Sequence, residues 1–373
     1  MGQPQHSRQA PSLSSSSLPN TSSPNPHIPP LVNHPHNGRQ NGARKAPHGP
    51  RRPRRPVRIS HLPLPPTSPS ALTPNTRSLP QDFDFTTLYR LYLADDPRPH
   101  GLLTAKNVSL LPWTPAFAID HAARKIHLSD TSAGADPTAS LTASLQSVID
   151  DSLSRAIFPQ LANKHSEHCL ILGAEHPVTV ERFPSPLLGV SSRGAHLTAY
   201  VGKGRDMRVW VAKRSARIFT HPGKLDTSVA GGVKAGDTAL DCVVAESDEE
   251  ASLDRAFVRE RAVPTGAVTY VSRNPRNDTV QPVVLYVFDL EVPEDVKLAP
   301  QDDEVEAFML MSVDEVFDAM LEWRFKPNCC LVMIDFFIRH GIITDENEPQ
   351  YLELLTRLHR PLPIPLAPSR KDE

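Results

Sequence analysis

Three glutamates near the middle of the chain, Glu246, Glu249 and Glu250, have a spacing that places their side chains on one face of a helix. Carboxylates crowded on one helix face repel each other, and a hard divalent cation between them relieves that repulsion. Mg²⁺ and Mn²⁺ both favour oxygen ligands. We therefore predict a site for Mg²⁺, or Mn²⁺, at these side chains. A lone Glu-x-x-Glu-Glu is usually a solvated helix face, so the prediction depends on the surrounding sequence.

The surrounding stretch, residues 231–253, reads GGVKAGDTALDCVVAESDEEASL. A glycine-rich turn precedes a helix for which Thr238 is the expected N-cap, with Asp241 as its reciprocal partner. The apolar residues of this helix fall on the face beside the glutamates, where they can pack into a core; they are Leu240, Val243, Val244 and Ala251. The turn and the helix are thus predicted to present the three carboxylates together.

This stretch resembles the signature of the Nudix hydrolases. That signature reads Gly, five residues, Glu, seven residues, Arg-Glu, an apolar residue, any residue, Glu-Glu, any residue, Gly and an apolar residue. The spacing matches throughout from Gly231. Four positions differ in type: Asp237 replaces a Glu, Ala245 the Arg, Ser247 an apolar residue and Ser252 the second Gly. Ala245 is the most serious departure, because the family arginine braces the acidic cluster.

The resemblance implies that Glu246, Glu249 and Glu250 are the catalytic and metal-binding residues. It also implies that the backbone carbonyl of Ala230 is a further metal ligand. The catalytic base is one of the same glutamates or an acid from a later loop, where the segment DDEVEAF contains Glu304 and Glu306. The implied reaction is Mg²⁺-dependent hydrolysis of a diphosphate linkage in a small organic molecule.

A wider part of the chain, residues 83–361, resembles the thiamine-pyrophosphokinase-related branch of Nudix proteins. The segments that carry this resemblance include GLLTAKNVSLLPW (101–113), LLGVSSRGAHLTAYV (187–201), VWVAKRS (209–215), HPGKLDTSVAGGV (221–233) and RFKPNCCLVMIDFFIRHGIIT (324–344). The branch implies thiamine diphosphate or its analogues as substrate, with oxidised nucleotides such as 8-oxo-dGDP as the alternative class. A true thiamine kinase is not expected, because the sequence has no P-loop pattern. A catalytically weak binding or regulatory module with the Nudix fold remains an alternative, because of Ala245.

Basic residues near the signature are candidates for substrate binding. Lys213 and Arg214 end an expected strand, and Lys224 lies in the loop that follows it. These side chains can bind substrate phosphates, or they can be ordinary surface residues of a half-exposed strand. Arg255 or Arg259 could replace the brace that is missing at Ala245.

We expect the 373 residues to form four parts. Residues 1–81 are a disordered Pro/Ser/Arg-rich tail, 82–188 a small α+β domain, 189–345 a Nudix domain, and 346–373 a C-terminal helix and tail. The tail contains no Asp or Glu and shows no apolar periodicity. Its basic run RRPRRPVR (51–58) is either a plain linker, a nuclear signal, a contact for acidic partners or part of a mitochondrial transit peptide.

The expected fold class is α/β, with a Nudix-type α/β/α sandwich around a mixed sheet. Helices are predicted over residues 84–95, 103–112, 141–160, 312–320, 328–340 and 344–360, and a hairpin over 117–130. Strands are predicted over 195–202, 207–214, 266–274, 281–292 and 304–311. Ser312 and Glu315 form an expected capping box at the start of the helix over 312–320. Gly341 is expected to end the helix over 328–340.

Composition narrows the function classes. The net charge of −2 gives no signal for a nucleic-acid polymer or a membrane as partner, and no apolar run has the length of a membrane span. The four cysteines are expected to be free thiols in a reducing compartment such as the cytoplasm, with mitochondria or nucleus as alternatives. The expected partner is a small-molecule diphosphate. The oligomeric state is left open.

Overall fold

The computed structural model describes residues 77–369, all of which belong to one compact unit. The basic run 51–58 and most of the expected tail lie outside the described residues. The expected boundary at residue 81 stays a prediction, and the described residues begin just before it. Strand β1 (Arg77–Ser78) pairs antiparallel with β12 (Val263–Asn274), and Leu79, which is buried, donates its amide to the carbonyl of Val271 at 2.9 Å. Strand pairing and apolar burial order this short segment.

The large sheet is mixed, as predicted, and has the order β1-β12-β13-β8-β9-β10. Strands β8 and β13 run parallel, and their other pairings are antiparallel. Strand β11 also pairs with β8, and β14 pairs with β9. The strands besides β1 and β12 are β8 (Ser192–Val201), β9 (Arg208–Arg214), β10 (Leu225–Asp226), β11 (Val229–Gly232), β13 (Thr279–Glu291) and β14 (Val305–Ser312).

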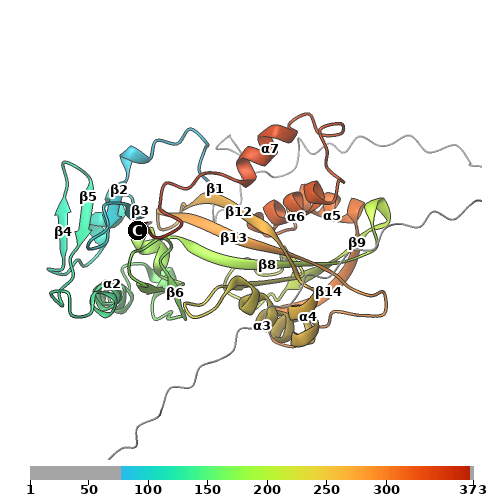
Figure 1. The fold of residues 1–373 in the computed structure, drawn as a ribbon, viewed down its shortest axis with the longest axis horizontal. Coiled ribbons are helices and arrows are strands. Elements are labelled where there is room, and N and C mark those ends of the chain that lie inside the picture. The colour runs from blue at the N-terminus through green and yellow to red at the C-terminus, as the bar shows by residue number, and fades with distance from the viewer. Residues whose placement is uncertain (1–76, 370–373) are drawn as a thin grey trace, which may run out of the picture. The chain divides into compact units, whose positions relative to one another are not determined.

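Helices cover both faces of this sheet, which confirms the predicted α/β/α sandwich (Figure 1). One face carries α5 (Val313–Leu321), α6 (Pro327–Arg339) and α7 (Tyr351–Leu358), and the other carries α3 (Ala239–Ala251) and α4 (Arg255–Arg261). The core on the first face is built around Phe325, Phe336 and Phe337. The predicted capping box of Ser312 and Glu315 is present, and Gly341 has a φ of +65° just after α6.

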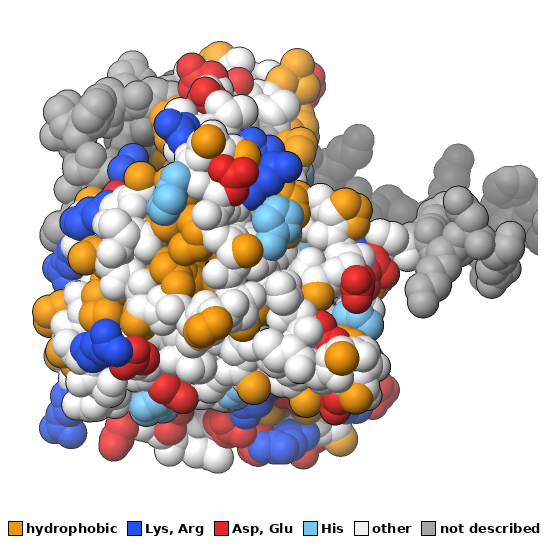
Figure 2. Space-filling model, turned by 90° about the vertical axis from the view of Figure 1, so that its left-hand side faces the viewer, with side chains coloured by type: hydrophobic (Ala, Val, Ile, Leu, Met, Phe, Trp, Pro, Cys, Tyr) orange, Lys and Arg blue, Asp and Glu red, His pale blue; other side chains and the backbone are white. Residues whose placement is uncertain are grey.

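The residues before β8 form a smaller sheet of order β3-β2-β5-β4, which packs on α2, and a separate hairpin, β6–β7. Their bounds are β2 (Tyr89–Tyr92), β3 (Pro99–Leu103), α1 (Ala105–Leu110), β4 (Phe117–Asp120), β5 (Lys125–Leu128), α2 (Pro137–Ser154), β6 (His168–Leu170) and β7 (Thr179–Glu181). Figure 2 shows the molecule from the side of this smaller sheet. Apolar side chains lie toward the middle of this face, and acidic and basic side chains lie around them. The predicted short helix, hairpin and long helix are confirmed.

The helix predicted over residues 84–95 is wrong. A short 3₁₀ helix, Phe85–Thr87, is followed by strand β2, which lies between β3 and β5. Neighbouring residues Leu91 and Tyr92 are both buried, so the strand is covered on both faces. A strand covered on both faces has no alternation of polar and apolar residues, and its apolar run therefore imitates a helical spacing.

The smaller sheet and the large sheet are connected by hydrogen bonds. The amide of Leu102 donates to the carbonyl of Gly189 at 3.1 Å, and the Thr104 hydroxyl donates to the carbonyl of Asp278 at 3.3 Å. After α7, Arg360 donates to the carbonyl of Leu79 at 2.7 Å. The domain boundaries at 188/189 and 345/346 remain predictions.

All four cysteines are free and buried, as predicted. No helix within residues 77–369 is both long and apolar enough to cross a membrane.

Candidate functional site

The helix that carries the glutamates, α3, begins as the sequence predicts. The Thr238 hydroxyl accepts the amide of Asp241, and the Asp241 carboxylate accepts the amide of Thr238, each at 3.1 Å. Val243, Val244 and Ala251 are buried against the sheet, whereas Leu240 is half-buried. Helix α3 therefore has its apolar face against the sheet, and its glutamates are placed by the same rotation.

The helix ends at Ser252, which has a left-handed φ of +53°. Glycine is favoured in this conformation because it lacks a Cβ, and this is the position where the Nudix signature has its second glycine. The Ser252 hydroxyl donates to the carbonyl of Ala299 at 3.0 Å. Serine is thus accommodated here with one compensating hydrogen bond.

Two of the three glutamates lie against strand β11. A Cβ on Gly231 would stand 2.3 Å from Oε1 of Glu246, so only glycine lets this carboxylate approach the strand so closely. The amide of Ala230 donates to Oε2 of Glu250 at 3.3 Å. The glycine-rich turn and the helix therefore meet through Glu246 and Glu250, as the sequence analysis expects.

Burial and mutual repulsion raise the pKa of both carboxyls. Burial, followed by the charges of Glu249 and Glu304, raises the pKa of Glu246 to about 7, while Lys234 and Arg182 act in the opposite direction. Burial and the charge of Glu246 hold the pKa of Glu250 well above its usual range. Within residues 77–369 no Arg or Lys side chain forms an ion pair with either carboxylate. A buried carboxylate, Glu250, and a half-buried one, Glu246, without a cationic partner fit a divalent cation.

Both glutamates line a cavity of about 460 Å³, together with Ala230 and Gly231. Glu304, in the loop before β14, also lines this cavity, whereas Glu306 does not. Of the two candidate acids from the later loop, only Glu304 therefore lies at the cavity. Several apolar and aromatic side chains form another part of the wall: Phe183, Tyr270, Val283, Leu285 and Leu331.

Glu249 is not brought into the cavity. Its side chain is 52% exposed and lies 3.5 Å from the guanidinium of Arg255. On α3 it points toward solvent, so the helical spacing that groups the three glutamates places only two of them against β11. Asp237, at the first Glu position of the signature, lies in the turn before α3 and also does not line the cavity.

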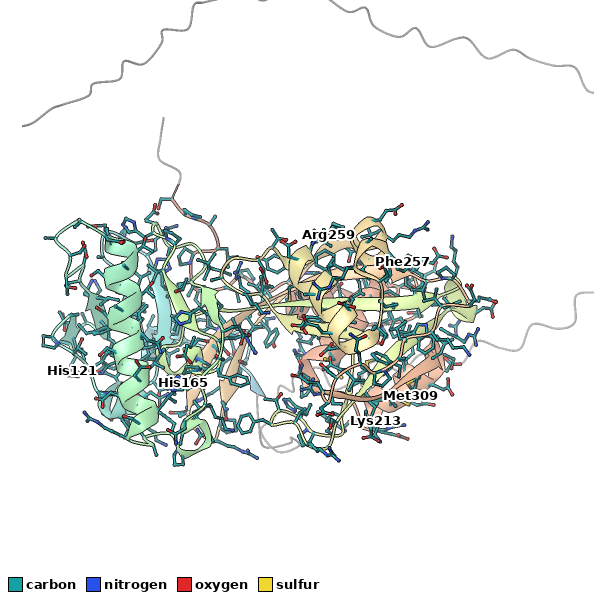
Figure 3. All side chains as sticks on the ribbon, turned by 90° about the horizontal axis from the view of Figure 1, so that it is seen from below. His121, His165, Lys213, Phe257, Arg259 and Met309 are labelled. Atoms are coloured by element: carbon teal, nitrogen blue, oxygen red, sulfur yellow. The ribbon has the colours of Figure 1, made fainter. Side chains whose placement is uncertain are left out.

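The predicted cations divide in the same way. Lys213, which is labelled in Figure 3, bonds to Glu306 at 2.5 Å and does not line the cavity. Lys224 donates to the carbonyl of Trp323 and does not line the cavity either. Arg214 does line it, because neighbouring residues on β9 point to opposite faces.

Neither candidate for the missing brace forms an ion pair with Glu246 or Glu250. Arg255 donates to Asp248 at 2.7 Å, and Arg259, on α4 in Figure 3, donates to Asp241 at 2.7 Å. Among the described residues, neither arginine of α4 therefore takes the place that the family arginine would have at position 245.

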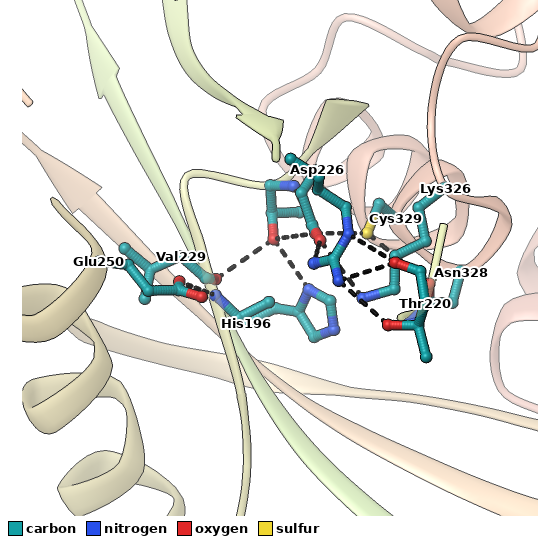
Figure 4. A network of polar contacts seen from close by, with 11 residues as sticks. His196, Thr220, Asp226, Val229, Glu250, Lys326, Asn328 and Cys329 are labelled. Atoms are coloured by element: carbon teal, nitrogen blue, oxygen red, sulfur yellow. Dashed lines mark hydrogen bonds and ion pairs between the residues drawn. The ribbon is translucent and has the colours of Figure 1, made fainter. Parts of the chain in front are cut away.

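A buried polar network beside the cavity was not predicted (Figure 4). Its centre is Asp226, which accepts from Arg214 at 2.8 Å, from Lys326 at 3.3 Å and from the Cys329 thiol at 2.6 Å. Burial opposes ionisation of Asp226, but Lys326 and Arg214 together hold its pKa below the usual range. No sequence spacing could show this network, because Asp226 and Lys326 are 100 residues apart.

The ligand atoms of His196, Asp226 and Cys329 lie within 4.8 Å of one another. Asp226 already forms ion pairs with Arg214 and Lys326, and the positive charges of these two side chains disfavour a metal ion at this place. The glutamates of α3 do not form such a trio among the described side chains. Beside α3, Glu246, Glu250 and Ala230 line the cavity, and their role as metal ligands stays a prediction.

Further cations line the cavity without having been predicted: Arg182, Arg193 and Lys326. Arg182 directly follows β7, and Lys326 directly precedes α6. Neither lies near the signature in sequence, so motif spacing carried no signal for them.

Comparison with known proteins finds a domain family that matches the part of the chain containing this site. A NUDIX domain matches residues 193–328. The chain is 42% identical over 199 residues to an uncharacterized protein of Saccharomyces cerevisiae, which covers 50% of this chain and 58% of that protein. In Arabidopsis thaliana it is 39% identical to Nudix hydrolase 20, chloroplastic, covering 48% of this chain and 47% of the relative. It is 37% identical to Nudix hydrolase 24, chloroplastic, of the same plant, covering 48% of this chain and 48% of that relative.

The chain thus spans about half the length of the curated relatives it matches. The domain match and the two named plant relatives support the Nudix part of the expected resemblance. The thiamine-pyrophosphokinase-related branch stays a prediction.

Proposed function

We propose, from the match of residues 193–328 to the NUDIX domain, that the protein is a divalent-metal-dependent hydrolase that cleaves the diphosphate linkage of a small organic diphosphate. One observation carries the proposal. Glu246, Glu250 and Ala230 line the same cavity of about 460 Å³ as Arg182, Arg193 and Lys326. Oxygen donors for a metal ion and cations for phosphate oxygens are therefore available within one space.

The carboxylates of Glu246 and Glu250 and the carbonyl of Ala230 would hold Mg²⁺ or Mn²⁺. The bound ion would neutralise charge on the phosphate oxygens and lower the pKa of a water bound to it. Glu304 lines the cavity from a different loop and is our candidate for the base that accepts a proton from the attacking water. Glu249 is the weaker candidate for metal binding because its side chain is 52% exposed.

For the substrate we propose an organic diphosphate that carries a ring. The apolar and aromatic wall contributed by Phe183, Tyr270 and Leu285 supports this choice, because it offers surface for a ring to pack on. Thiamine diphosphate or its analogues, and oxidised nucleotides such as 8-oxo-dGDP, are the first compounds to examine.

The test is hydrolysis of a panel of diphosphates with and without Mg²⁺, following phosphate and the monophosphate product. Glu246→Gln and Glu250→Gln keep the side-chain shape and remove one charge each. Each is expected to reduce turnover by roughly two or more orders of magnitude. Glu260→Gln, at an exposed position on α4, is the matched control. Wild-type turnover by both site variants at limiting Mg²⁺ would refute the assignment.

Ala245 favours one alternative, a ligand-binding or regulatory module with the Nudix fold. Ala245→Arg restores the family residue and discriminates between the two functions. If neither the wild type nor Ala245→Arg hydrolyses any diphosphate and both bind one tightly, the protein is a binding module.

A further inference from the structure

Arg182 enters the cavity from outside the family domain. It directly follows β7 and precedes the residues that match the NUDIX domain, 193–328. Its amide donates to the carbonyl of Glu167 at 3.0 Å. The amide of Ala235, in the turn after β11, donates to the carbonyl of His168 at 2.8 Å. The β6–β7 hairpin is therefore attached to the turn that leads into α3.

The guanidinium of Arg182 is held by one edge. Its Nε donates to the Glu167 carboxylate, and its central carbon lies 4.9 Å from the centre of the Phe183 ring. The two terminal nitrogens form no hydrogen bond to any of residues 77–369. A planar guanidinium whose Nε is occupied still has its terminal N–H groups available for the oxygens of an anion.

The second glycine of the turn makes room for this side chain. A Cβ on Gly232 would stand 2.5 Å from Cδ and 2.6 Å from Nε of Arg182. Gly231 makes the corresponding room for Glu246. The two neighbouring glycines thus admit a carboxylate and a guanidinium close to β11, and both side chains line the cavity.

Two of the other basic side chains of the cavity, Arg214 and Lys326, are more fully engaged. Arg214 bonds to Asp226 at 2.8 Å and to the carbonyl of Thr220 at 3.0 Å, and Lys326 bonds to the same Asp226 at 3.3 Å. Arg193 donates to the carbonyl of Lys234 at 3.3 Å. The network around Asp226 commits its two cations to a buried carboxylate, which leaves Arg182 and Arg193 as donors for a phosphate. Of these two, Arg182 is the one whose guanidinium is oriented by an ion pair.

We propose that Arg182 binds a phosphate group of the substrate, so that a residue from the preceding hairpin completes the substrate site of the Nudix domain. The inference rests on the proposed function, since the ligand is the diphosphate of that reaction. Glu167 acts as a positioning residue that holds the Nε edge and leaves the terminal nitrogens directed to the ligand. With Arg182 in this role, the second glycine of the turn, Gly232, serves to admit its side chain.

The experiment measures binding of imidodiphosphate, a diphosphate that resists hydrolysis, by calorimetry in the presence of Mg²⁺. Arg182→Ala is expected to weaken this binding by about 10- to 100-fold, the loss of one or two charge-assisted hydrogen bonds. Arg182→Lys keeps the charge without the two parallel donors and is expected to fall in between. Arg155→Ala removes an arginine that is 61% exposed in a surface ion pair on α2, and it is the matched control.

Binding of Mn²⁺ alone, followed by electron paramagnetic resonance, is expected to stay within about threefold of wild type in both Arg182 variants, because Arg182 is not a metal ligand. With an active substrate, KM is expected to rise more than kcat falls. If Arg182→Ala folds poorly, the imidodiphosphate affinity of Arg182→Lys relative to wild type decides whether Arg182 binds the phosphate. Imidodiphosphate binding equal to wild type in the variant that folds, or no imidodiphosphate binding by the wild type, overturns the proposal. Absence of hydrolysis by the wild type would refute the proposed function, while the binding comparison still decides the role of Arg182.

Discussion

Replacing Glu246 by glutamine is expected to stabilise the metal-free protein at neutral pH while it removes metal binding. Burial and neighbouring carboxylates raise the pKa of Glu246 from 4.5 to about 7 in the folded protein. The native state therefore binds this proton more tightly than the unfolded state. The stability associated with the neutral carboxyl is fully present below pH 4.5 and is lost as the pH rises through about 7.

The magnitude follows from the two pKa values. Their difference corresponds to a loss of about 3 kcal/mol in the free energy of unfolding once the carboxyl is ionised. For a chain of this size, that is on the order of 5–10 °C in Tm. Glutamine has nearly the same shape and cannot ionise, so Glu246→Gln does not carry this loss. The gain is expected to be smaller than the full amount, because the buried amide needs hydrogen-bond partners.

The assay is urea or thermal unfolding of wild type and Glu246→Gln with a chelator, at about pH 5 and about pH 8, on the two sides of the transition. The two proteins are expected to differ little at the lower pH, and the variant is expected to be more stable at the higher pH. Mg²⁺ at about ten times its Kd should stabilise the wild type by about 1.4 kcal/mol and leave the variant unchanged. Glu260→Gln, at an exposed position, is the control.

Two results would refute this reasoning. If the metal-free variant is no more stable than the wild type at the higher pH, then Glu246 is not destabilised by its surroundings. If Mg²⁺ stabilises both proteins equally, the ion does not bind at Glu246.

Four further predictions concern the same site and its support. Glu249→Gln is expected to change Mg²⁺-dependent turnover by less than about threefold, since this side chain is 52% exposed; a loss as large as that of Glu250→Gln would contradict its placement. Ala245→Arg should lower the Mg²⁺ concentration needed for half-maximal rate, because a guanidinium can hold neighbouring carboxylates in place; an unchanged metal dependence would show that another group already does so. Gly231→Ala should weaken Mn²⁺ binding by about tenfold or more, because its Cβ would stand 2.3 Å from the Glu246 carboxylate, and paramagnetic resonance would detect this. A chain that begins at residue 82 instead of 77 should lose about 1–3 kcal/mol in urea unfolding, because it loses the buried Leu79 side chain and the β1 pairing; equal stability would show that this segment contributes nothing.

The sequence by itself determined the elements that depend on near neighbours. The capping box of Thr238 and Asp241 starts α3 through hydrogen bonds that span three residues. The spacing of glycine and glutamates then places Glu246 and Glu250 one turn apart on the same helix face. These features follow from backbone geometry over a few residues, so reading the chain locally is enough to find them.

Only the tertiary structure decided which side chains share the cavity. The signature groups Glu249 with the other glutamates, but the rotation of α3 against the sheet leaves Glu249 in solvent. Two of the three predicted cations, Lys213 and Lys224, lie outside the cavity, because a strand alternates its faces and a loop can turn away. Segment 84–95 also illustrates this limit, since burial of β2 on both faces removed the alternation that marks a strand.

The cations that do line the cavity depend on contacts between distant segments. Lys326 pairs with Asp226 across 100 residues, and Arg182 reaches the turn before α3 from a separate hairpin. Long-range charge pairs and close packing against a glycine arise when the chain folds back on itself. Nothing in the local spacing of one sequence encodes which distant partner a charged side chain will meet.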